Sequence, residues 1–361
     1  MKTEELLKLR SEIDILDEKI LELLNQRAEI ALKIGNIKIK NNLHFWDPQR
    51  EKEIFNRLKL LNKGPLSDKA IFNIFHEIIT ATRELQCPTK VTFLGPEATF
   101  SHMAAIKHFG KAALFYPVAT IKDVFHEVEK GHYDYGVVPV ENSIEGVVAF
   151  TLDMFMQFNL NVCGEIYLKV NHYLASITRE KKDIEKIYAH PQAAAQCREW
   201  LASNLPNIAI EEVGSTALAA QKAKEDPKAA AITTKLAAEK YGLYILEEHI
   251  EDFAHNTTRF WIIGHQLPKP TGHDKTSLIF ATPHRPGALY EALRPFAERK
   301  INLTKLESRP MKSLPWHYLF FVDLEGHYND KIIKEAINEL KEICAYLKLL
   351  GSYPRAQTID L

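Results

Sequence analysis

The first forty residues carry a heptad pattern of leucine and isoleucine that a single arginine interrupts. Apolar residues at this spacing predict one long helix with a stripe that packs against partner helices. Arg27 falls within the stripe, where a guanidinium is costly unless an anion meets it. Either the Arg27 head reaches solvent from a coiled-coil seam, or it lines an anion pocket inside a helical bundle. The stripe consists of Leu6, Leu9, Ile13, Leu16, Ile20, Leu23, Arg27, Ile30, Ile34 and Ile37.

Two other cations of this helix favour the pocket. Lys38 follows Arg27 by 11 positions, about three turns at roughly 3.6 residues each, so both side chains point to the same side. Arg10 precedes Arg27 by 17 positions and lies roughly 100° around the helix. We therefore expect Arg10 to serve a second site, across a dimer.

Two further helices are predicted. Asp47 caps the second helix, Pro48 opens it, and Arg50 and Glu51 follow in its first turn. The third helix runs from about Ser67 to Gln86 and sets Thr82 and Gln86 one turn apart. The cluster contains no evident nucleophile–base pair, and its cations fit a small dianion.

Residues 1–86 resemble the all-helical chorismate mutase domain. The resemblance implies an intertwined dimer that rearranges chorismate to prephenate, with Arg10 entering the partner's site. This pericyclic reaction needs no proton or covalent step, so clamping and electrostatic stabilisation suffice. By resemblance Arg10, Arg27 and Arg50 bind carboxylates, Lys38 and Gln86 face the ether oxygen, and Asp47 and Glu51 hold the substrate hydroxyl or the cations. Thr82 stands where the bacterial pattern often has Ser. The matching elements are Arg10, Gln26-Arg27-Ala28-Glu29, Gly35-Asn36-Ile37-Lys38, Asp47-Pro48-Gln49-Arg50-Glu51 and Thr82 with Gln86.

Composition excludes several classes of protein. A net charge of −1 over 361 residues gives no electrostatic footprint for nucleic acid or an anionic membrane. We expect neither a signal peptide nor a membrane span, because no suitable apolar run occurs. The four cysteines are scattered and the histidines lack metal-ligand spacing, so we expect reduced thiols, a cytoplasmic location, no metal and no cofactor.

Two breaks divide the chain into three expected domains. Cys87-Pro88-Thr89-Lys90 ends the helical part, and Leu267-Pro268-Lys269-Pro270-Thr271-Gly272 reads as a second linker. The expected domains span residues 1–87, 88–268 and 273–361.

The middle domain alternates strand-like and helix-like segments, which predicts an α/β domain with mainly parallel sheets. Polar residues follow several strands, and Asn142 and Glu145 have the spacing of a capping box. Each junction alone could be only a helix cap, but several together indicate a carboxylate-binding cleft. The expected strands are Val91–Gly95, Tyr135–Val140, His172–Ile177, Ile208–Val213 and Arg259–Gly264. The expected helices are Ala98–Phe109, Ile121–Lys130, Glu145–Phe158, Pro191–Ser203 and Ala217–Lys224.

Residues 88–266 resemble prephenate dehydratase. The matching stretches are Gly95-Pro96-Glu97-Ala98-Thr99-Phe100-Ser101, Val138-Pro139-Val140-Glu141-Asn142-Ser143, His190-Pro191-Gln192-Ala193 and Asn256-Thr257-Thr258-Arg259-Phe260. The family fold is a pair of α/β lobes, like a periplasmic binding protein, with the site between them.

This resemblance implies loss of CO₂ and hydroxide from prephenate, which requires mainly a proton donor for the leaving hydroxyl. Thr258 is implied as that donor or as its positioning group, and Arg259 as a group that steadies the anionic substrate. Glu141 or a water is the alternative donor, and Ala98 stands where the family usually has Gly. The remaining implied substrate-binding residues are Thr99, Ser101, Asn142, Ser143, Asn256 and Phe260.

Residues 275–353 read strand, helix, long hairpin, helix, strand, which predicts a ferredoxin-like fold. Pro286-Gly287 opens a helix through Glu298, Trp316–Leu324 is a strand, and Lys331–Ala345 is a helix. The segments Arg285-Pro286-Gly287-Ala288-Leu289 and Leu306-Glu307-Ser308-Arg309-Pro310 resemble the ACT amino-acid-sensing domain. The resemblance implies that phenylalanine binds between two such domains. The implied residues are Gly287, Ala288, Leu289, Glu307, Ser308, Arg309 and Pro310.

Together the three segments resemble the bifunctional chorismate mutase/prephenate dehydratase family, with chorismate and prephenate as substrates and phenylalanine as effector. The expected fold is therefore multidomain: an all-α dimerising domain, a two-lobed α/β domain and an α+β regulatory domain. We expect a homodimer or higher homo-oligomer, with no nucleic-acid or membrane partner. Two alternatives remain: an amino-acid-responsive binding protein without turnover, and a structural coiled coil at the N-terminus.

Overall fold

The computed structural model describes residues 2–41, 46–311 and 318–356 and contains two compact units. The first unit comprises residues 1–89 and 109–114, and the second comprises residues 90–108 and 115–361. No helix in the described part of the chain has both the length and the apolar character needed to cross a membrane.

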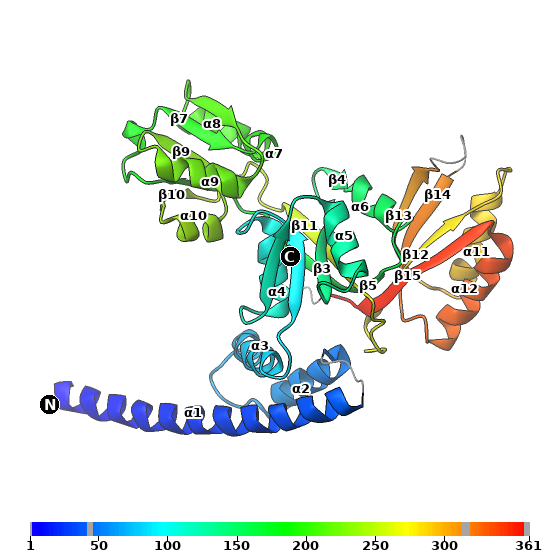
Figure 1. Ribbon diagram of the computed structural model, residues 1–361, viewed down its shortest axis with the longest axis horizontal. Helices are drawn as coiled ribbons and strands as arrows, with labels where there is room; N and C mark the ends of the chain where they lie inside the picture. Colours follow the sequence, from blue (N-terminus) through cyan, green and yellow to red (C-terminus); the bar gives the residue numbers. More distant parts are fainter. Residues whose placement is uncertain (1, 42–45, 312–317, 357–361) are drawn as a thin grey trace. The chain divides into compact units, whose positions relative to one another are not determined.

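The described part of the first unit contains the three predicted helices: α1 (Lys2–Lys40), α2 (Pro48–Leu61) and α3 (Asp68–Glu84) (Figure 1). Both predicted N-caps are confirmed. The Asp47 carboxylate accepts a hydrogen bond from the backbone N–H of Arg50, and the Ser67 hydroxyl accepts one from Ala70. These caps fix where α2 and α3 begin, and α3 packs against both other helices.

Within one chain, α1 does not bury its apolar stripe. The buried or half-buried positions of its second half are Leu24, Arg27, Ala28, Ala31, Gly35 and Lys38. They recur every three or four residues and so form one helix face. The leucines and isoleucines of the predicted stripe stay solvent-exposed, for example Ile13 at 55% and Leu23 at 63%.

The second unit begins with a mixed sheet in the order β2-β1-β3-β11-β5, with β4 paired to β3. Strand β11 is antiparallel to both of its neighbours, and β1 and β3 are parallel. The strands are β1 (Lys90–Leu94), β2 (Leu114–Val118), β3 (Tyr135–Asn142), β4 (Gly146–Val147), β5 (Asn161–Lys169) and β11 (Thr257–Gly264). The helices are α4 (Phe100–Phe109), α5 (Ile121–Glu129) and α6 (Ala149–Met154).

A second lobe is built from the chain between β5 and β11, with the sheet order β10-β6-β9-β7-β8. Its strands are β6 (Tyr173–Ser176), β7 (Lys186–Ala189), β8 (Ala209–Glu212), β9 (Ala229–Thr233) and β10 (Tyr244–Glu248). Its helices are α7 (Pro191–Gln196), α8 (Arg198–Asn204), α9 (Thr216–Glu225) and α10 (Lys235–Tyr241), with a 3₁₀ turn at Lys181–Asp183. The two lobes confirm the α/β prediction.

The expectation of mainly parallel sheets is wrong. Strand β5 leads the chain out to the second lobe and β11 brings it back beside β5, so the two strands run in opposite directions. Strand β6 is likewise antiparallel to β9 and β10.

The predicted helix Glu145–Phe158 is also wrong in its first turn. The Asn142 side-chain oxygen Oδ1 accepts from the backbone N–H groups of Ile144 and Glu145, as a helix cap would. Gly146 then takes a positive φ of 83°, and the chain forms β4 before α6 starts at Ala149. The predicted helix Pro191–Ser203 is interrupted at Cys197.

Residues 274–354 form the predicted ferredoxin-like fold, an antiparallel sheet in the order β13-β14-β12-β15 with two helices. One sheet face packs on the helices through Phe280, Phe296 and Leu324. The other face shares a hydrophobic core with the first lobe. The elements are β12 (Asp274–Ala281), α11 (Ala288–Glu298), β13 (Leu303–Pro310), β14 (Tyr318–Glu325), α12 (Lys331–Ile343) and β15 (Tyr346–Pro354). Trp316 and His317 of the predicted strand lie outside the described residues.

Candidate functional site

The three helices of the first unit enclose a pocket of about 450 Å³. Aliphatic side chains form part of its lining, including Ile34, Ile54 and Ile79. The predicted residues that the structure brings to this pocket are Arg27, Lys38, Asp47, Arg50, Glu51, Thr82 and Gln86. Arg10 does not line it, as its angular position on α1 predicts.

Residues of α3 fix the position of the Arg27 side chain. Its guanidinium donates to the backbone oxygen of Ile78 at 3.3 Å and to the hydroxyl of Thr82. The Thr82 hydroxyl in turn donates to the Ile78 oxygen at 2.8 Å. Burial lowers the pKa of Arg27, because partial removal from water disfavours the charged form of the guanidinium. Thr82 therefore orients the cation that the sequence places in the stripe.

Two arginines that the sequence analysis missed also line the pocket, Arg57 and Arg83. Arg83 is buried, and its Nη1 lies 2.9 Å from a carboxylate oxygen of Glu51. Burial raises the pKa of Glu51 and Arg83 lowers it, with a net rise. One signal could have revealed Arg83: it follows Ile79 by four positions and precedes Gln86 by three, so it shares their helix face.

Gln86 enters the pocket because α1 carries a glycine opposite it. A Cβ at Gly35 would lie 2.9 Å from both Cβ and Cγ of Gln86, so only glycine permits this approach. The Gln86 amide nitrogen donates to the Thr82 backbone oxygen at 3.4 Å. Its Oε1 is buried with no hydrogen-bond partner among the described residues, and the second proton of its amide nitrogen remains available to donate to a ligand.

In the second unit, Asn142 at the end of β3 contacts Thr258 on β11. Since its oxygen accepts the two turn N–H groups, its amide nitrogen must be the atom that faces Thr258. That nitrogen donates to the Thr258 hydroxyl at 2.9 Å and to the Asn256 oxygen at 2.6 Å. The Thr258 oxygen thus accepts a hydrogen bond, and its own proton is left for another acceptor.

Asn256 joins this group to side chains that the sequence analysis did not select. Its amide donates to Gln196 at 3.0 Å, and His172 lies 2.8 Å from the same Gln196 oxygen. Gln196 donates to Glu145 at 2.8 Å. Gln196 lies one turn after Gln192 of the His-Pro-Gln stretch, and this i, i+4 spacing was the available signal.

Family models match all three segments of the chain. Residues 9–87 match chorismate mutase type II, residues 91–267 match prephenate dehydratase, and residues 276–342 match the ACT domain. A bifunctional chorismate mutase/prephenate dehydratase of Aquifex aeolicus is 50% identical over 98% of this chain and 99% of its own. The enzyme of the same name from Pseudomonas aeruginosa is 44% identical over 96% of this chain and 97% of its own. The chain belongs to the bifunctional chorismate mutase/prephenate dehydratase family.

A solved structure supports the fold of the second unit. The prephenate dehydratase of Arthrobacter aurescens, solved in complex with L-Phe, is 37% identical with a TM-score of 0.68. The match covers 74% of this chain and 90% of that chain.

The structure places two predicted residues of the dehydratase domain, Glu141 and Arg259, apart from Thr258. They pair with each other across β3 and β11, next to the pair of Asn142 and Thr258. Because side chains alternate along a strand, Glu141 and Arg259 point to the face opposite Thr258. There Arg259 contacts Glu141, Glu165 and Asp323, so neither predicted residue is grouped with Thr258.

The other predicted dehydratase residues occupy supporting positions. Ser143 donates to the backbone oxygen of His255 at 3.2 Å and accepts from Thr257 at 3.0 Å, which ties the two loops together. The Thr99 hydroxyl donates to the backbone oxygen of Pro96 at 2.9 Å. Ser101 and Phe260 are buried.

Ala98, the departure from the family's usual glycine, has a φ of 65° and is buried. Glycine favours this left-handed conformation, which explains the usual residue. Here Ala98 is held by hydrogen bonds: its N–H donates to His102 at 3.0 Å and its oxygen accepts from Thr234 at 2.8 Å.

The predicted sensor segments of the ACT domain lie at the start of α11 and along β13. Gly287 caps α11 with a positive φ of 81°, Ala288 is buried, and Leu289 packs on the domain's core. Along β13, Glu307 and Arg309 are half-buried, while Ser308 and Pro310 are exposed. Strand β13 lies at the edge of its four-stranded sheet.

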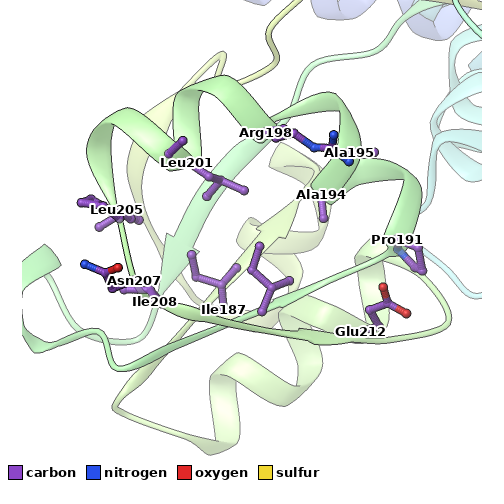
Figure 2. A pocket seen from close by; sticks show the side chains of 13 residues that line it. Ile187, Pro191, Ala194, Ala195, Arg198, Leu201, Leu205, Asn207, Ile208 and Glu212 are labelled. Atoms are coloured by element: carbon purple, nitrogen blue, oxygen red, sulfur yellow. The ribbon is translucent and has the colours of Figure 1, made fainter.

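A second pocket, of about 400 Å³, lies in the second lobe between α7, α8, β7 and β8 (Figure 2). Its lining is mostly aliphatic, with Ile187, Leu201 and Leu205, and its charged groups are Arg198 and Glu212. None of the predicted site residues lines it. We assign it no part in the reactions of this family.

Proposed function

We propose that this chain rearranges chorismate to prephenate in the first unit and converts prephenate to phenylpyruvate in the second, under inhibition by phenylalanine. The observation that carries the proposal is the pocket of the first unit. It gathers the matching residues from three helices, with cations in a partly apolar enclosure. A dianion fits that chemistry.

In the mutase pocket, Arg27, Arg50 and Arg57 supply charge for the two carboxylates of chorismate. Lys38 and Gln86 face the ether oxygen, on which negative charge grows as the bond breaks. Donors fixed in place before the reaction stabilise this charge without reorganising, and the apolar walls strengthen their effect. The carboxylate of Glu51, paired with Arg83, holds the substrate hydroxyl.

In the dehydratase site, Thr258 gives its proton to the leaving hydroxyl of prephenate. The ring carboxylate departs as CO₂, its electron pair aromatises the ring, the hydroxyl leaves as water, and solvent water returns a proton to the Thr258 oxygen. The support for this role is the hydrogen-bond direction, since the Asn142 amide occupies an acceptor site of Thr258 and leaves its proton available.

We also propose a homodimer formed through the exposed stripe of α1, with Arg10 reaching the partner's pocket. Exposed apolar residues along a helix of 39 residues need such a partner. Phenylalanine is proposed to bind at Gly287–Leu289 and Glu307–Pro310, in line with the L-Phe complex of the Arthrobacter relative. The proposed domains span residues 1–87, 88–268 and 273–361.

One coupled assay tests the two activities: chorismate consumption and phenylpyruvate formation, each with and without phenylalanine. Lys38→Ala should abolish only the mutase step, and Thr258→Val, which keeps the shape of the side chain, only the dehydratase step. Each variant is thus the control for the other. Binding of chorismate or phenylalanine without turnover of either substrate would favour a binding protein and refute the proposal.

A further inference from the structure

Arg259 lies at the centre of a buried cluster of charges that joins the dehydratase sheet to the ACT sheet. Its side chain is 3% exposed, and the contacting side chains of Glu165 and Asp323 are 0% and 2% exposed. Its Nη2 lies 2.8 Å from Glu165 on β5, and its Nη1 lies 2.5 Å from Asp323 on β14 of the ACT domain. One guanidinium therefore holds a carboxylate from each domain.

Two hydroxyl groups close a ring around this contact. Arg259 donates to the Tyr353 hydroxyl at 3.1 Å, and Ser277 donates to the second oxygen of Asp323 at 2.5 Å. The hydroxyl oxygens of Ser277 and Tyr353 lie 2.6 Å apart. Because the single hydroxyl proton of Ser277 goes to Asp323, the Tyr353 hydroxyl must donate to Ser277. Ser277 and Tyr353 both belong to the ACT domain, as does Asp323, so most of the ring lies in that domain.

Further ion pairs join the same two domains around the ring. Lys275 lies 3.0 Å from Glu165, and Lys305 contacts Glu141. The cluster therefore contains three cations, Arg259, Lys275 and Lys305, and three anions, Glu141, Glu165 and Asp323. Glu141 is 31% exposed, but the other five side chains are at most 9% exposed, so the cluster resists partial opening because each lost contact leaves a charge without its partner.

The cluster is separated from Thr258 by a single peptide unit. Arg259 follows Thr258 on β11, and their side chains point to opposite faces of the same strand. On β3 the same is true of Glu141 and Asn142. A register shift falls between Arg259 and Phe260, and such bulges re-aim neighbouring side chains.

We propose that Asp323 and Tyr353 are positioning residues for the dehydratase. They hold Arg259, Arg259 fixes β11, and β11 sets the Thr258 hydroxyl against the Asn142 amide. Phenylalanine acts by changing how the ACT sheet holds Arg259. The inference rests on the proposed function and assigns Arg259 to regulation instead of substrate binding.

The test measures kcat/KM for prephenate with and without saturating phenylalanine, together with phenylalanine binding by calorimetry. In Asp323→Asn, which removes the charge and keeps the shape, the ratio of the two kcat/KM values should move at least fivefold toward one. The basal kcat should also fall, with KM little changed. Tyr353→Phe keeps every charge and should shift the ratio in the same direction by a smaller factor. Both variants should still bind phenylalanine.

Glu325→Gln is the matched control. Glu325 lies two residues along β14 and pairs with Arg355 at 2.6 Å, outside the cluster, so its ratio should equal that of the wild type. A wild-type ratio in both Asp323→Asn and Tyr353→Phe overturns the inference, and so does loss of phenylalanine binding in both. A wild-type enzyme that phenylalanine does not inhibit refutes the proposed feedback itself, and the inference with it.

Discussion

At the scale of single residues, the direction of one hydrogen bond determines what Thr258 can do. Asn142→Asp keeps an oxygen for the turn N–H groups of Ile144 and Glu145 but replaces the donor that faces Thr258 by an acceptor. The Thr258 proton would then be held by the new carboxylate. We expect dehydratase kcat to fall about 100-fold, the lower range for loss of a general acid. The mutase rate measured on the same sample is the control, and a dehydratase rate within twofold of the wild type would contradict the role of Thr258.

Lys38 should make the mutase sensitive to alkaline pH. Burial lowers the pKa of Lys38, Asp47 and Glu51 raise it, and Arg83 lowers it, with a net decrease. The cation is therefore lost as pH rises through a value below the ordinary lysine pKa of about 10.4. We expect the mutase kcat/KM to fall as the pH rises, with a midpoint below the ordinary lysine pKa. The reason is that kcat/KM reports the ionisation of essential groups in the free enzyme.

Lys38→Arg provides the comparison, because arginine stays charged throughout this range. Its pH profile should lose the alkaline decline, although its maximum rate should be lower. An identical alkaline limb in both proteins would assign the titration to another group.

At the scale of helices, the contact between α1 and α3 depends on Gly35. In Gly35→Ala, alanine should favour the helix by about 1 kcal/mol, but its Cβ would lie 2.9 Å from Gln86. Overpacking of this kind typically costs about 1–3 kcal/mol, so the crowding wins. We expect a lower melting temperature and at least a tenfold loss of mutase kcat. Asn36→Ala, the next and exposed position, gains helix propensity without crowding and should keep both. Full mutase activity in Gly35→Ala would show that catalysis does not require the observed position of Gln86.

The sequence predicts elements well where the signal is local. Asp47 and Ser67 mark helix starts because a helix cap depends only on the capping residue and the three residues that follow it. The pairing of Glu141 with Arg259 could not be predicted, because strand alternation places the two side chains on one face only once the register of β3 and β11 is known. Strand β9 was missed because three of its five residues are alanines, which are depleted in strands.

At the scale of the whole molecule, the proposed dimer assembles each mutase site from two chains. A mixture of Arg10→Ala and Arg27→Ala chains should therefore recover mutase activity, because one of the two sites in a heterodimer receives both intact arginines. Recovery should approach a quarter of the wild-type rate after random exchange, with mass spectrometry confirming the mixed dimers. Arg10→Ala mixed with itself is the control. Mixed dimers without recovered activity would mean that each site is built within one chain.

The exposed stripe of α1 also has a consequence for biosynthesis. Domains fold in order during translation, so this helix leaves the ribosome before α2 and α3 exist. Its leucines and isoleucines then face water and remain exposed even after the rest of the first unit has folded. If the proposed dimer covers this stripe, a newly made chain should be prone to aggregate until it meets a second copy, and the yield of soluble enzyme should depend on how close together the chains are synthesised.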